Sequence, residues 1–312
     1  MSERYLLGDW GTTNLRLYLM EGDRVADVRQ GPGIGGLKQP PATVLNTLIE
    51  EWLGREIPID VVLCGMASSR TGLLELPYVK APANFATWAQ ASRCIQVGSA
   101  RVLVATGLQC GDDQHGFDVM RGEEAQIFGA LETQPALADG RHFFVLPGTH
   151  SKWVEVVQGS IVQFRTALTG ELYALLREHS TLLPAGATGT RDLEFDQGFA
   201  AGSQRSLAAD EGLLTAIFKT RTAQLLQQRS PTWASGFLSC VLIGDELTTM
   251  SRAFDLAGST VALIGDAQLA ALYERAFAAR GVTTRLLSGE ATVLASMRHL
   301  WEQRAQTLEK AI

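Results

Sequence analysis

The sequence predicts an α/β protein that is built from two lobes. Residues 4–30 are expected to form three short strands joined by tight turns, and residues 142–166 repeat this order about half a chain later. Farther on, apolar runs at 238–245 and 261–266 are interpreted as buried strands that end in Gly-Asp and precede helices, an order that favours parallel strands. A chain of 312 residues, 46% of them hydrophobic, can bury one large or two ordinary cores.

Composition excludes several classes of protein. The net charge is −6 and no basic block is present, so nucleic acid and anionic membranes are unexpected partners. No apolar run reaches about 18 residues, so no membrane span is expected. The polar opening MSERY leads into a strand, which is not the pattern of a signal peptide. Cys64, Cys94, Cys110 and Cys240 show no metal-ligand spacing, so we expect reduced thiols in a cytoplasmic protein.

The turn between the first two predicted strands carries an unusual density of small polar residues. Gly11 lets backbone N–H groups approach an anion, because no Cβ stands in the way. Thr12, Thr13 and Asn14 add side-chain donors. Asp9 supplies a fixed negative charge that could hold Mg²⁺ through water. The turn is therefore predicted to bind a phosphate and its metal, with an ordinary hairpin as the alternative.

A second turn of the same kind follows the apolar strand that begins near residue 143. Its residues are Gly148, Thr149, His150, Ser151 and Lys152. Lys152 would neutralise phosphate charge there, or it is an outward lysine at the start of a strand. His150 has no evident acidic partner in the sequence, so we do not expect it to be catalytic. Two such turns, half a chain apart, would serve a two-lobed ATPase.

Further candidate residues lie at two other places. Ser69 and Arg70 occupy a small-residue loop after a buried strand, where open α/β sheets place ligands. Glu123 and Glu124 precede a predicted helix, whose dipole alone would explain two acids there. Arg121 could clamp a carboxylate, since a guanidinium matches that group bidentately.

Five motifs in order give the sequence a family resemblance. They are DWGTTNLR at 9–16, CGMASSRTG at 64–72, MRGEEAQIFG at 120–129, LPGTHSKWV at 146–154 and LTGELYALLREHS at 168–180. Together they resemble the 2-dehydro-3-deoxygalactonokinases, which belong to the sugar kinase/actin-like ATPase superfamily. The resemblance covers most of residues 4–200 and continues more loosely to the C-terminus.

The resemblance implies an architecture and a reaction. It implies two actin-like (ribonuclease H-like) lobes with a nucleotide cleft between them. Residues 1–135 would form the first lobe, the terminal helix 289–312 would pack back on it, and residues 136–288 would form the second. ATP and Mg²⁺ would lie between the two turns. The acceptor would be the terminal 6-hydroxyl of 2-dehydro-3-deoxy-D-galactonate, a small-molecule sugar acid of galactonate catabolism.

The resemblance also implies roles for single residues. Glu124 would be the catalytic base, with Glu123 second and Asp9 as the third acid of the site. The sugar acid would be contacted by a larger set, which is Arg16, Ser69, Arg70, Arg121 and Glu171. Apart from the resemblance, Gly244 and Asp245 end a predicted strand, where the glycine could pack under an adenine and the aspartate could accept a ribose hydroxyl, although helix capping would also explain an aspartate there.

Three other functions compete with this one. An exopolyphosphatase-like phosphohydrolase would use the same glutamate to activate water. A kinase for the gluconate-derived 2-keto-3-deoxy acid would differ by the orientation of one hydroxyl, and the preference for the galacto form comes only from the resemblance. A non-catalytic regulator on the same fold is disfavoured by the acidic charge. A homodimer is compatible with the sequence, which does not specify it.

Overall fold

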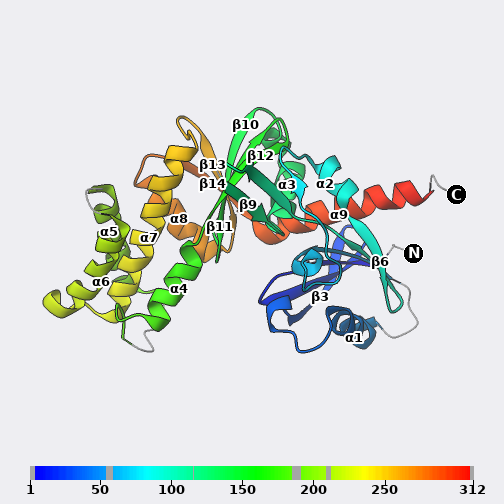
Figure 1. Cartoon of the computed structure of the whole chain (residues 1–312), viewed down its shortest axis with the longest axis horizontal. Coiled ribbons are helices and arrows are strands. Elements are labelled where there is room, and N and C mark those ends of the chain that lie inside the picture. The colour runs from blue at the N-terminus through cyan, green and yellow to red at the C-terminus, as the bar shows by residue number, and fades with distance from the viewer. Residues whose placement is uncertain (1–3, 54–58, 115, 185–190, 209–211, 310–312) are drawn as a thin grey trace. The chain divides into compact units, whose positions relative to one another are not determined.

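The computed structural model describes residues 4–53, 59–114, 116–184, 191–208 and 212–309, and the chain divides into two compact units (Figure 1). Unit 1 comprises Met1–Arg141, Val156–Phe164 and Gly289–Ile312. Unit 2 comprises His142–Glu155 and Arg165–Ser288. The first lobe was expected to include residues 1–3 and 310–312, which lie outside the described residues.

A six-stranded sheet with the order β3-β2-β1-β4-β7-β6 forms the centre of unit 1. The strands are β1 (Arg4–Trp10), β2 (Asn14–Glu21), β3 (Arg24–Pro32), β4 (Ile59–Gly65), β6 (Arg93–Val97) and β7 (Ala100–Val104). β2 is antiparallel to β1 and to β3, whereas β4 runs parallel to β1 and to β7. The side chains of Tyr5, Leu6, Leu7 and Trp10 are at most 1% exposed. β1 is therefore a central strand that is covered on both faces, as its nearly continuous apolar run requires.

Helices and a smaller sheet complete unit 1. They are α1 (Pro41–Leu53), α2 (Phe85–Ala91), α3 (Glu123–Thr133), α9 (Gly289–Glu309), β5 (Val79–Lys80), β8 (Leu108–Asp112) and β9 (Gly116–Met120). α9 packs along α3 (Figure 1), and a Cβ on Gly129 would lie 1.6 Å from the carbonyl oxygen of Thr292. The rings of Tyr5 and Trp301 stack with centroids 3.9 Å apart. Glycine at position 129 thus sets how closely these two helices approach.

A second large sheet, most of which lies in unit 2, has the order β12-β11-β10-β13-β14, and residues 156–164 of its strands β11 and β12 belong to unit 1. Its strands are β10 (Arg141–Leu146), β11 (Ser151–Val157), β12 (Ser160–Ala167), β13 (Thr260–Gly265) and β14 (Thr283–Ser288). β13 is parallel to both β10 and β14. The order matches β3-β2-β1-β4-β7 of unit 1 strand for strand. The repeat that the two polar turns predict therefore extends to five neighbouring strands of each sheet.

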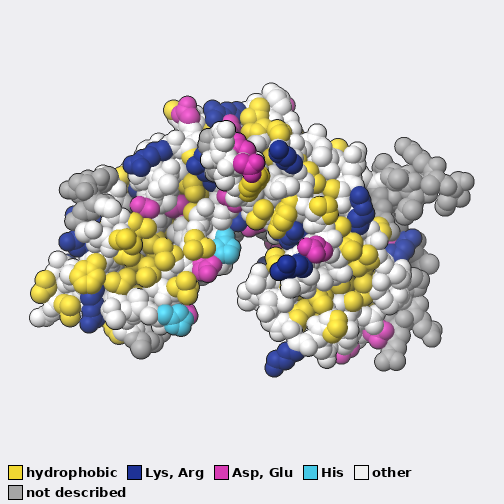
Figure 2. Space-filling model, in the orientation of Figure 1, with side chains coloured by type: hydrophobic (Ala, Val, Ile, Leu, Met, Phe, Trp, Pro, Cys, Tyr) yellow, Lys and Arg dark blue, Asp and Glu magenta, His cyan; other side chains and the backbone are white. Residues whose placement is uncertain are grey.

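The helices of unit 2 are α4 (Thr169–His179), α5 (Leu193–Ala208), α6 (Leu213–Gln227), α7 (Pro231–Ala253) and α8 (Ala267–Ala278). On α6, Leu214 and Leu226 are each 82% exposed, and hydrophobic side chains gather on the surface in this region (Figure 2). Within the described part of the chain, no helix combines the length and apolar character that a membrane span requires.

The prediction of a strand at 238–245 is wrong, because these residues lie inside α7. A short apolar run that is buried on all sides has the same signature in a strand and in a helix. The helix begins where Ser230 caps the backbone N–H of Trp233 at 3.1 Å, with Pro231 as the first helical residue. This Ser-Pro pair is the signal in the sequence that identifies the helix.

The contact between α3 and α9 can be tested by Gly129→Ala. The added methyl group must displace the backbone at Thr292, and such overpacking costs about 1–3 kcal/mol. We expect a lower midpoint in urea unfolding followed by circular dichroism. Gly36→Ala is the matched control, because a Cβ there meets nothing within 4 Å. Equal midpoints for the two variants would contradict this account of the packing.

Candidate active site

The first polar turn connects β1 to β2 and is fixed through its backbone. The N–H of Gly11 donates to the carbonyl of Asn14 at 2.8 Å. The loop that follows β3 packs on the turn, because Gly33 and Gly35 donate to the carbonyls of Thr13 and Thr12 at 3.0 and 2.9 Å. The side chains of Thr12, Thr13 and Asn14 are exposed. The turn is thus held rigidly while its side-chain donors remain accessible to a ligand.

Asp9 lies at the end of β1, between two neighbouring strands. Its register partners are Arg16 on β2 and Cys64 on β4. The Cys64 thiol donates to Asp9 Oδ1 at 3.8 Å. Burial raises the pKa of the Asp9 carboxyl above its ordinary value, and the charge of Glu123 raises it further. The structure therefore brings Asp9, Arg16 and Glu123 into one electrostatic neighbourhood.

Two glycines with positive φ allow this approach. Gly65 has φ +76°, and a Cβ there would lie 2.7 Å from the carbonyl oxygen of Trp10 and 3.0 Å from Asp9 Oδ1. Gly122 has φ +112°, and its Cβ would lie 3.3 Å from the Cα of Gly65. Any other residue at these positions would combine backbone strain with close contacts. The ends of β1 and β4 therefore meet the start of α3 backbone to backbone.

The two acids at the start of α3 occupy different environments. Glu124 is 0% exposed, and its carboxylate oxygens accept the N–H of Gly122 at 2.9 and 2.8 Å. Burial raises the pKa of Glu124 to about 8, and the charge of Glu123 contributes to the rise. Glu123 is partly exposed, and its Oε2 accepts the N–H of Arg121 at 2.9 Å. Of the two, Glu123 is therefore the acid that solvent can reach.

The guanidinium of Arg121 is oriented by residues that sequence reasoning did not single out. Nη1 donates to the carbonyl of Ser68 at 2.6 Å and to its hydroxyl at 2.5 Å. Nε donates to the Tyr78 hydroxyl at 3.3 Å, and the guanidinium carbon lies 4.2 Å from the centroid of that ring. Of the two residues that follow Ser68 in the sequence, Ser69 is buried and Arg70 is exposed. A cation held on three sides presents its remaining N–H groups in a fixed direction.

The second polar turn, in unit 2, is clamped by the start of α4. The N–H of Glu171 donates to the carbonyl of Thr149 at 2.9 Å, and a Cβ on Gly170 would lie 2.2 Å from the carbonyl oxygen of Gly148. His150 Nε2 lies 2.5 Å from Glu171 Oε2. The expectation that His150 has no acidic partner is therefore wrong. The sequence did not reveal this partner, because Glu171 lies on a helix 21 residues away in the chain.

Ser151 and Lys152 turn inward from this second turn. Ser151 is 0% exposed and Lys152 is 4% exposed. Lys152 Nζ donates to the carbonyl of His150 at 3.4 Å. The alternative of an outward lysine is therefore wrong, and the lysine charge lies beneath the backbone of the turn. A cavity of about 140 Å³ opens beside the second turn. It is lined by Gly148, Thr169, Gly170, Tyr173, Arg177 and Arg191 among others.

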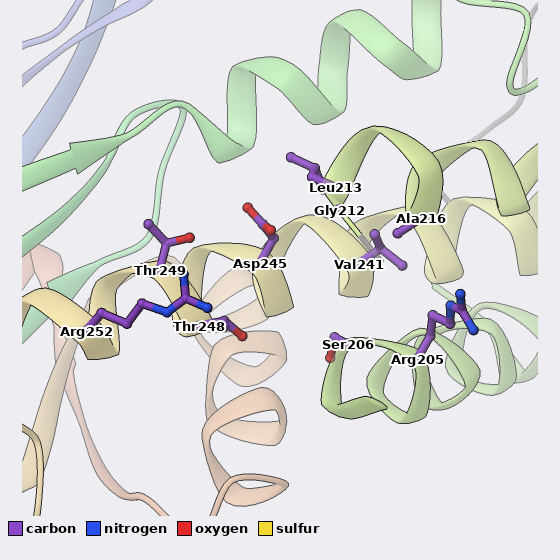
Figure 3. Close-up of a pocket in the computed structure, with 10 residues that line it drawn as sticks. All are labelled: Arg205, Ser206, Gly212, Leu213, Ala216, Val241, Asp245, Thr248, Thr249 and Arg252. Atoms are coloured by element: carbon purple, nitrogen blue, oxygen red, sulfur yellow. The ribbon is translucent and has the colours of Figure 1, made fainter. Parts of the chain in front are cut away.

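Gly244 and Asp245 lie in the middle of α7, so the assignment to adenosine loses its premise of a strand end. Gly244 is covered, because a Cβ there would lie 2.4 Å from the Cβ of Ser206. Asp245 faces a separate cavity of about 230 Å³ among α5, α6 and α7, where Arg205 and Arg252 also lie (Figure 3). Asp245 is not a helix cap either, because α7 continues past it. Within the described ranges, no group of three or more His, Cys, Asp or Glu side chains could hold a metal ion.

Comparison with known proteins places these features in a family. The sequence profile of the 2-keto-3-deoxy-galactonokinase family matches residues 9–300. The 2-dehydro-3-deoxygalactonokinase of Escherichia coli (strain K12) is 35% identical over 303 residues, 96% of this chain and 98% of that protein. A candidate enzyme of the same name from Rhizobium meliloti (strain 1021) is 30% identical over 308 residues, 95% of this chain and 97% of that protein.

A solved structure agrees with the sequence comparisons. The crystal structure of a candidate 2-dehydro-3-deoxygalactonokinase from Sinorhizobium meliloti has a TM-score of 0.85 at 29% identity, with 96% of both chains covered. The fold and these relatives define a sugar acid kinase, a phosphotransferase with an alcohol acceptor. Within that class, the chain belongs to the 2-keto-3-deoxy-galactonokinase family. The family resemblance of the five motifs and the predicted α/β fold are confirmed.

The buried Glu124 predicts a pH dependence of stability. Its pKa is about 8 in the folded protein, against 4.5 ordinarily, so between these values the folded state binds more protons than the unfolded state. Stability contributed by this carboxyl is present at low pH and is lost as the pH rises toward 8. Glu124→Gln removes this loss. Relative to the natural protein, the variant should gain at least about 1.4 kcal/mol, the equivalent of one pKa unit, between about pH 5 and about pH 8.

Urea unfolding at a series of pH values measures this difference directly. Glu51→Gln is the control, because Glu51 is exposed on α1. A constant difference between Glu124→Gln and the natural protein across this pH range would show that the burial of Glu124 does not shift its titration.

Proposed function

We propose that this chain transfers the terminal phosphoryl group of ATP to the 6-hydroxyl of 2-dehydro-3-deoxy-D-galactonate. The observation that carries the proposal is the convergence of Asp9, Glu123 and the oriented Arg121 at one end of the first sheet, in a chain of this family. These residues supply an acid for the metal, an acid for the acceptor hydroxyl and a cation for a carboxylate. The reaction is assigned to the cytoplasm, in keeping with the four free cysteines.

In this proposal Glu123 orients the acceptor hydroxyl and takes its proton. The acceptor oxygen forms a bond to the terminal phosphorus of ATP as the bond between that phosphorus and the oxygen that leaves with ADP breaks. The proton of the acceptor hydroxyl passes to Glu123 late in the transfer. The partial exposure of Glu123 supports this role, and the complete burial of Glu124 supports a different one. By accepting the N–H of Gly122, Glu124 holds the backbone from which Glu123 projects. The order of preference from the sequence, Glu124 before Glu123, is thereby reversed.

The sugar acid carboxylate is proposed to bind Arg121. Its Nε and Nη1 are already engaged by Tyr78 and Ser68, so the guanidinium is pre-oriented and loses little freedom on binding. Arg70 is exposed on the loop that contains Ser68 and is a second candidate for the carboxylate. Arg16, opposite Asp9, and Ser69 remain candidates for the sugar hydroxyls.

The phosphates and the metal are proposed to bind at the polar turns. In unit 1, Thr12, Thr13 and Asn14 offer accessible side-chain donors next to Gly11. In unit 2, the start of α4 contacts the turn that holds the second set, which is Gly148, Thr149, His150, Ser151 and Lys152. A helix N-terminus favours anions, and Glu171 would hold His150 there. The cavity beside the second turn is proposed to take part of the nucleotide in place of Gly244 and Asp245.

The acidic set of unit 1 fits a magnesium ion. The pKa of Asp9 is raised by burial and by Glu123, so a nearby cation would relieve an unfavourable concentration of negative charge. The described residues offer no complete cage, and Mg²⁺ is commonly held by one or two carboxylates together with substrate phosphates and water. When bound, Mg²⁺ neutralises charge on the transferred phosphoryl group. Asp9 would hold it, through water.

The substrate is tested by following ADP release with purified protein, ATP and Mg²⁺. We expect turnover with 2-dehydro-3-deoxy-D-galactonate, weaker turnover with the gluconate-derived acid, and none with hexoses that lack a carboxylate. Release of inorganic phosphate at the same rate without any sugar acid would overturn the kinase in favour of a phosphohydrolase. Equal turnover of the two sugar acids would overturn the galacto preference alone.

The assignment of the base is tested by Glu123→Gln beside Glu124→Gln. Loss of a general base reduces kcat by about 10²- to 10⁴-fold, so Glu123→Gln should lose activity on this scale while its affinity for ATP is retained. Glu124→Gln should lose less, because it affects only the position of the turn. The reverse ranking of the two kcat values would return the role of base to Glu124.

A further inference from the structure

A carboxylate lies in the interior of unit 2, beneath the second polar turn. Glu246 on α7 is 5% exposed. Its Oε1 accepts the indole N–H of Trp153 at 2.6 Å, and its Oε2 accepts the hydroxyls of Tyr273 at 2.6 Å and of Thr169. Burial raises the pKa of Glu246, and these hydrogen bonds oppose the rise. Glu246 is therefore a buried acid whose described partners are neutral donors.

This arrangement fixes the direction of several hydrogen bonds. An ionised carboxylate only accepts, and an indole N–H only donates. Because the single proton of the Tyr273 hydroxyl points at Glu246, the Ser151 hydroxyl must donate to the Tyr273 oxygen, which lies 2.9 Å away. The proton of Thr169 is likewise directed to Glu246. The carboxyl group of Glu246 thus orients the hydroxyls of Tyr273, Thr169 and Ser151.

The partners of Glu246 are the residues that build the second turn. Ser151 and Trp153 begin β11 directly after the turn, and Thr169 is the first residue of α4. The next two residues of α4 press on the backbone of Gly148 and Thr149. Tyr273 lies on α8, so Glu246 ties α4, β11 and α8 to α7.

Packing alone does not explain why a glutamate occupies position 246. Burying a carboxylate carries a large desolvation penalty, and apolar side chains of similar volume are often at least as stabilising. What a carboxylate adds is the orientation of the donors around it. We propose that Glu246 is a positioning residue that holds the start of α4 and the Ser151 hydroxyl in the arrangement that binds a nucleotide phosphate. This inference rests on the proposed assignment of the second turn to ATP.

The substitution Glu246→Gln separates orientation from packing. The amide is nearly isosteric, but its oxygen must face Trp153, because an indole cannot accept a hydrogen bond. Its NH₂ group then faces Tyr273 and Thr169, whose hydroxyls must become acceptors. The bond between Ser151 and Tyr273 reverses as a result, while the volume of the side chain is kept. Tyr273→Phe is the second variant, since it removes the hydroxyl that connects Glu246 to Ser151 and leaves the carboxyl group of Glu246 in place.

The test is calorimetric binding of ADP and of adenosine, without sugar acid, to the full chain. We expect Glu246→Gln to weaken ADP binding by about tenfold or more while adenosine binding is unchanged, because only ADP carries the phosphates that this turn would contact. Tyr273→Phe should show a smaller loss of the same kind. Glu155→Gln is the matched control, a buried glutamate on β11 that is 6% exposed. It should leave the ratio of the two affinities unchanged, whatever it does to the melting temperature.

The outcomes distinguish a failure of the proposed function from a failure of the positioning role of Glu246. If the natural protein binds neither ADP nor ATP, the proposed function fails and the positioning role fails with it. If the natural protein binds ADP and both variants keep the ratio of ADP to adenosine affinity, the positioning role is overturned and the kinase stands. If Glu246→Gln does not fold, the Tyr273→Phe ratio decides alone. An equal loss for both ligands would also overturn the inference, because it would indicate a purely structural role.

Discussion

The close approach of three backbone segments around Asp9 is the constraint on which the first half of the site depends. The ends of β1 and β4 and the start of α3 meet at Gly65 and Gly122, where no Cβ can be accommodated without displacement or strain. This contact brings Asp9 and Glu123 close enough for the charge of one to raise the pKa of the other. The same contact buries Glu124 and Cys64, and burial raises the pKa of both. The carboxyl groups of Asp9 and Glu123 therefore lie near each other where a cation and a phosphoryl group are proposed to bind.

The two polar turns are held in place by different contacts. In unit 1 the turn is held by backbone hydrogen bonds from a glycine-rich loop, so its side chains remain exposed. In unit 2 the turn is held from below, by the start of α4 and by a buried carboxylate that orients hydroxyls. The duplication of the sheet order explains why both turns exist, since each follows the first strand of its sheet. It does not dictate how each turn is supported, and the differences fall on helices that the shared sheet order leaves free to vary.

Local patterns predicted much of the fold and part of the site. The polar turns and the duplicated strands follow from residues that are close in sequence. The strand assigned to 238–245 failed, because a run buried on all sides has no periodicity that distinguishes a strand from a helix. The partners of Arg121 lie 43 and 53 residues away, and Trp153 and Glu246 are separated by 93. Such contacts are set by tertiary packing, so a single sequence gives no signal for them, and the same holds for the pairing of His150 with Glu171.

The central claim is that one phosphoryl group moves from ATP to one hydroxyl of a sugar acid, and analysis of the product tests it most directly. ³¹P and ¹H NMR of the reaction with 2-dehydro-3-deoxy-D-galactonate would show to which carbon the new phosphate is attached, while ADP is quantified in the same sample. The account predicts one phosphate monoester on the terminal CH₂ for each ADP formed, with little free phosphate. Free inorganic phosphate equal to the ADP, or an ester at another carbon, would contradict it.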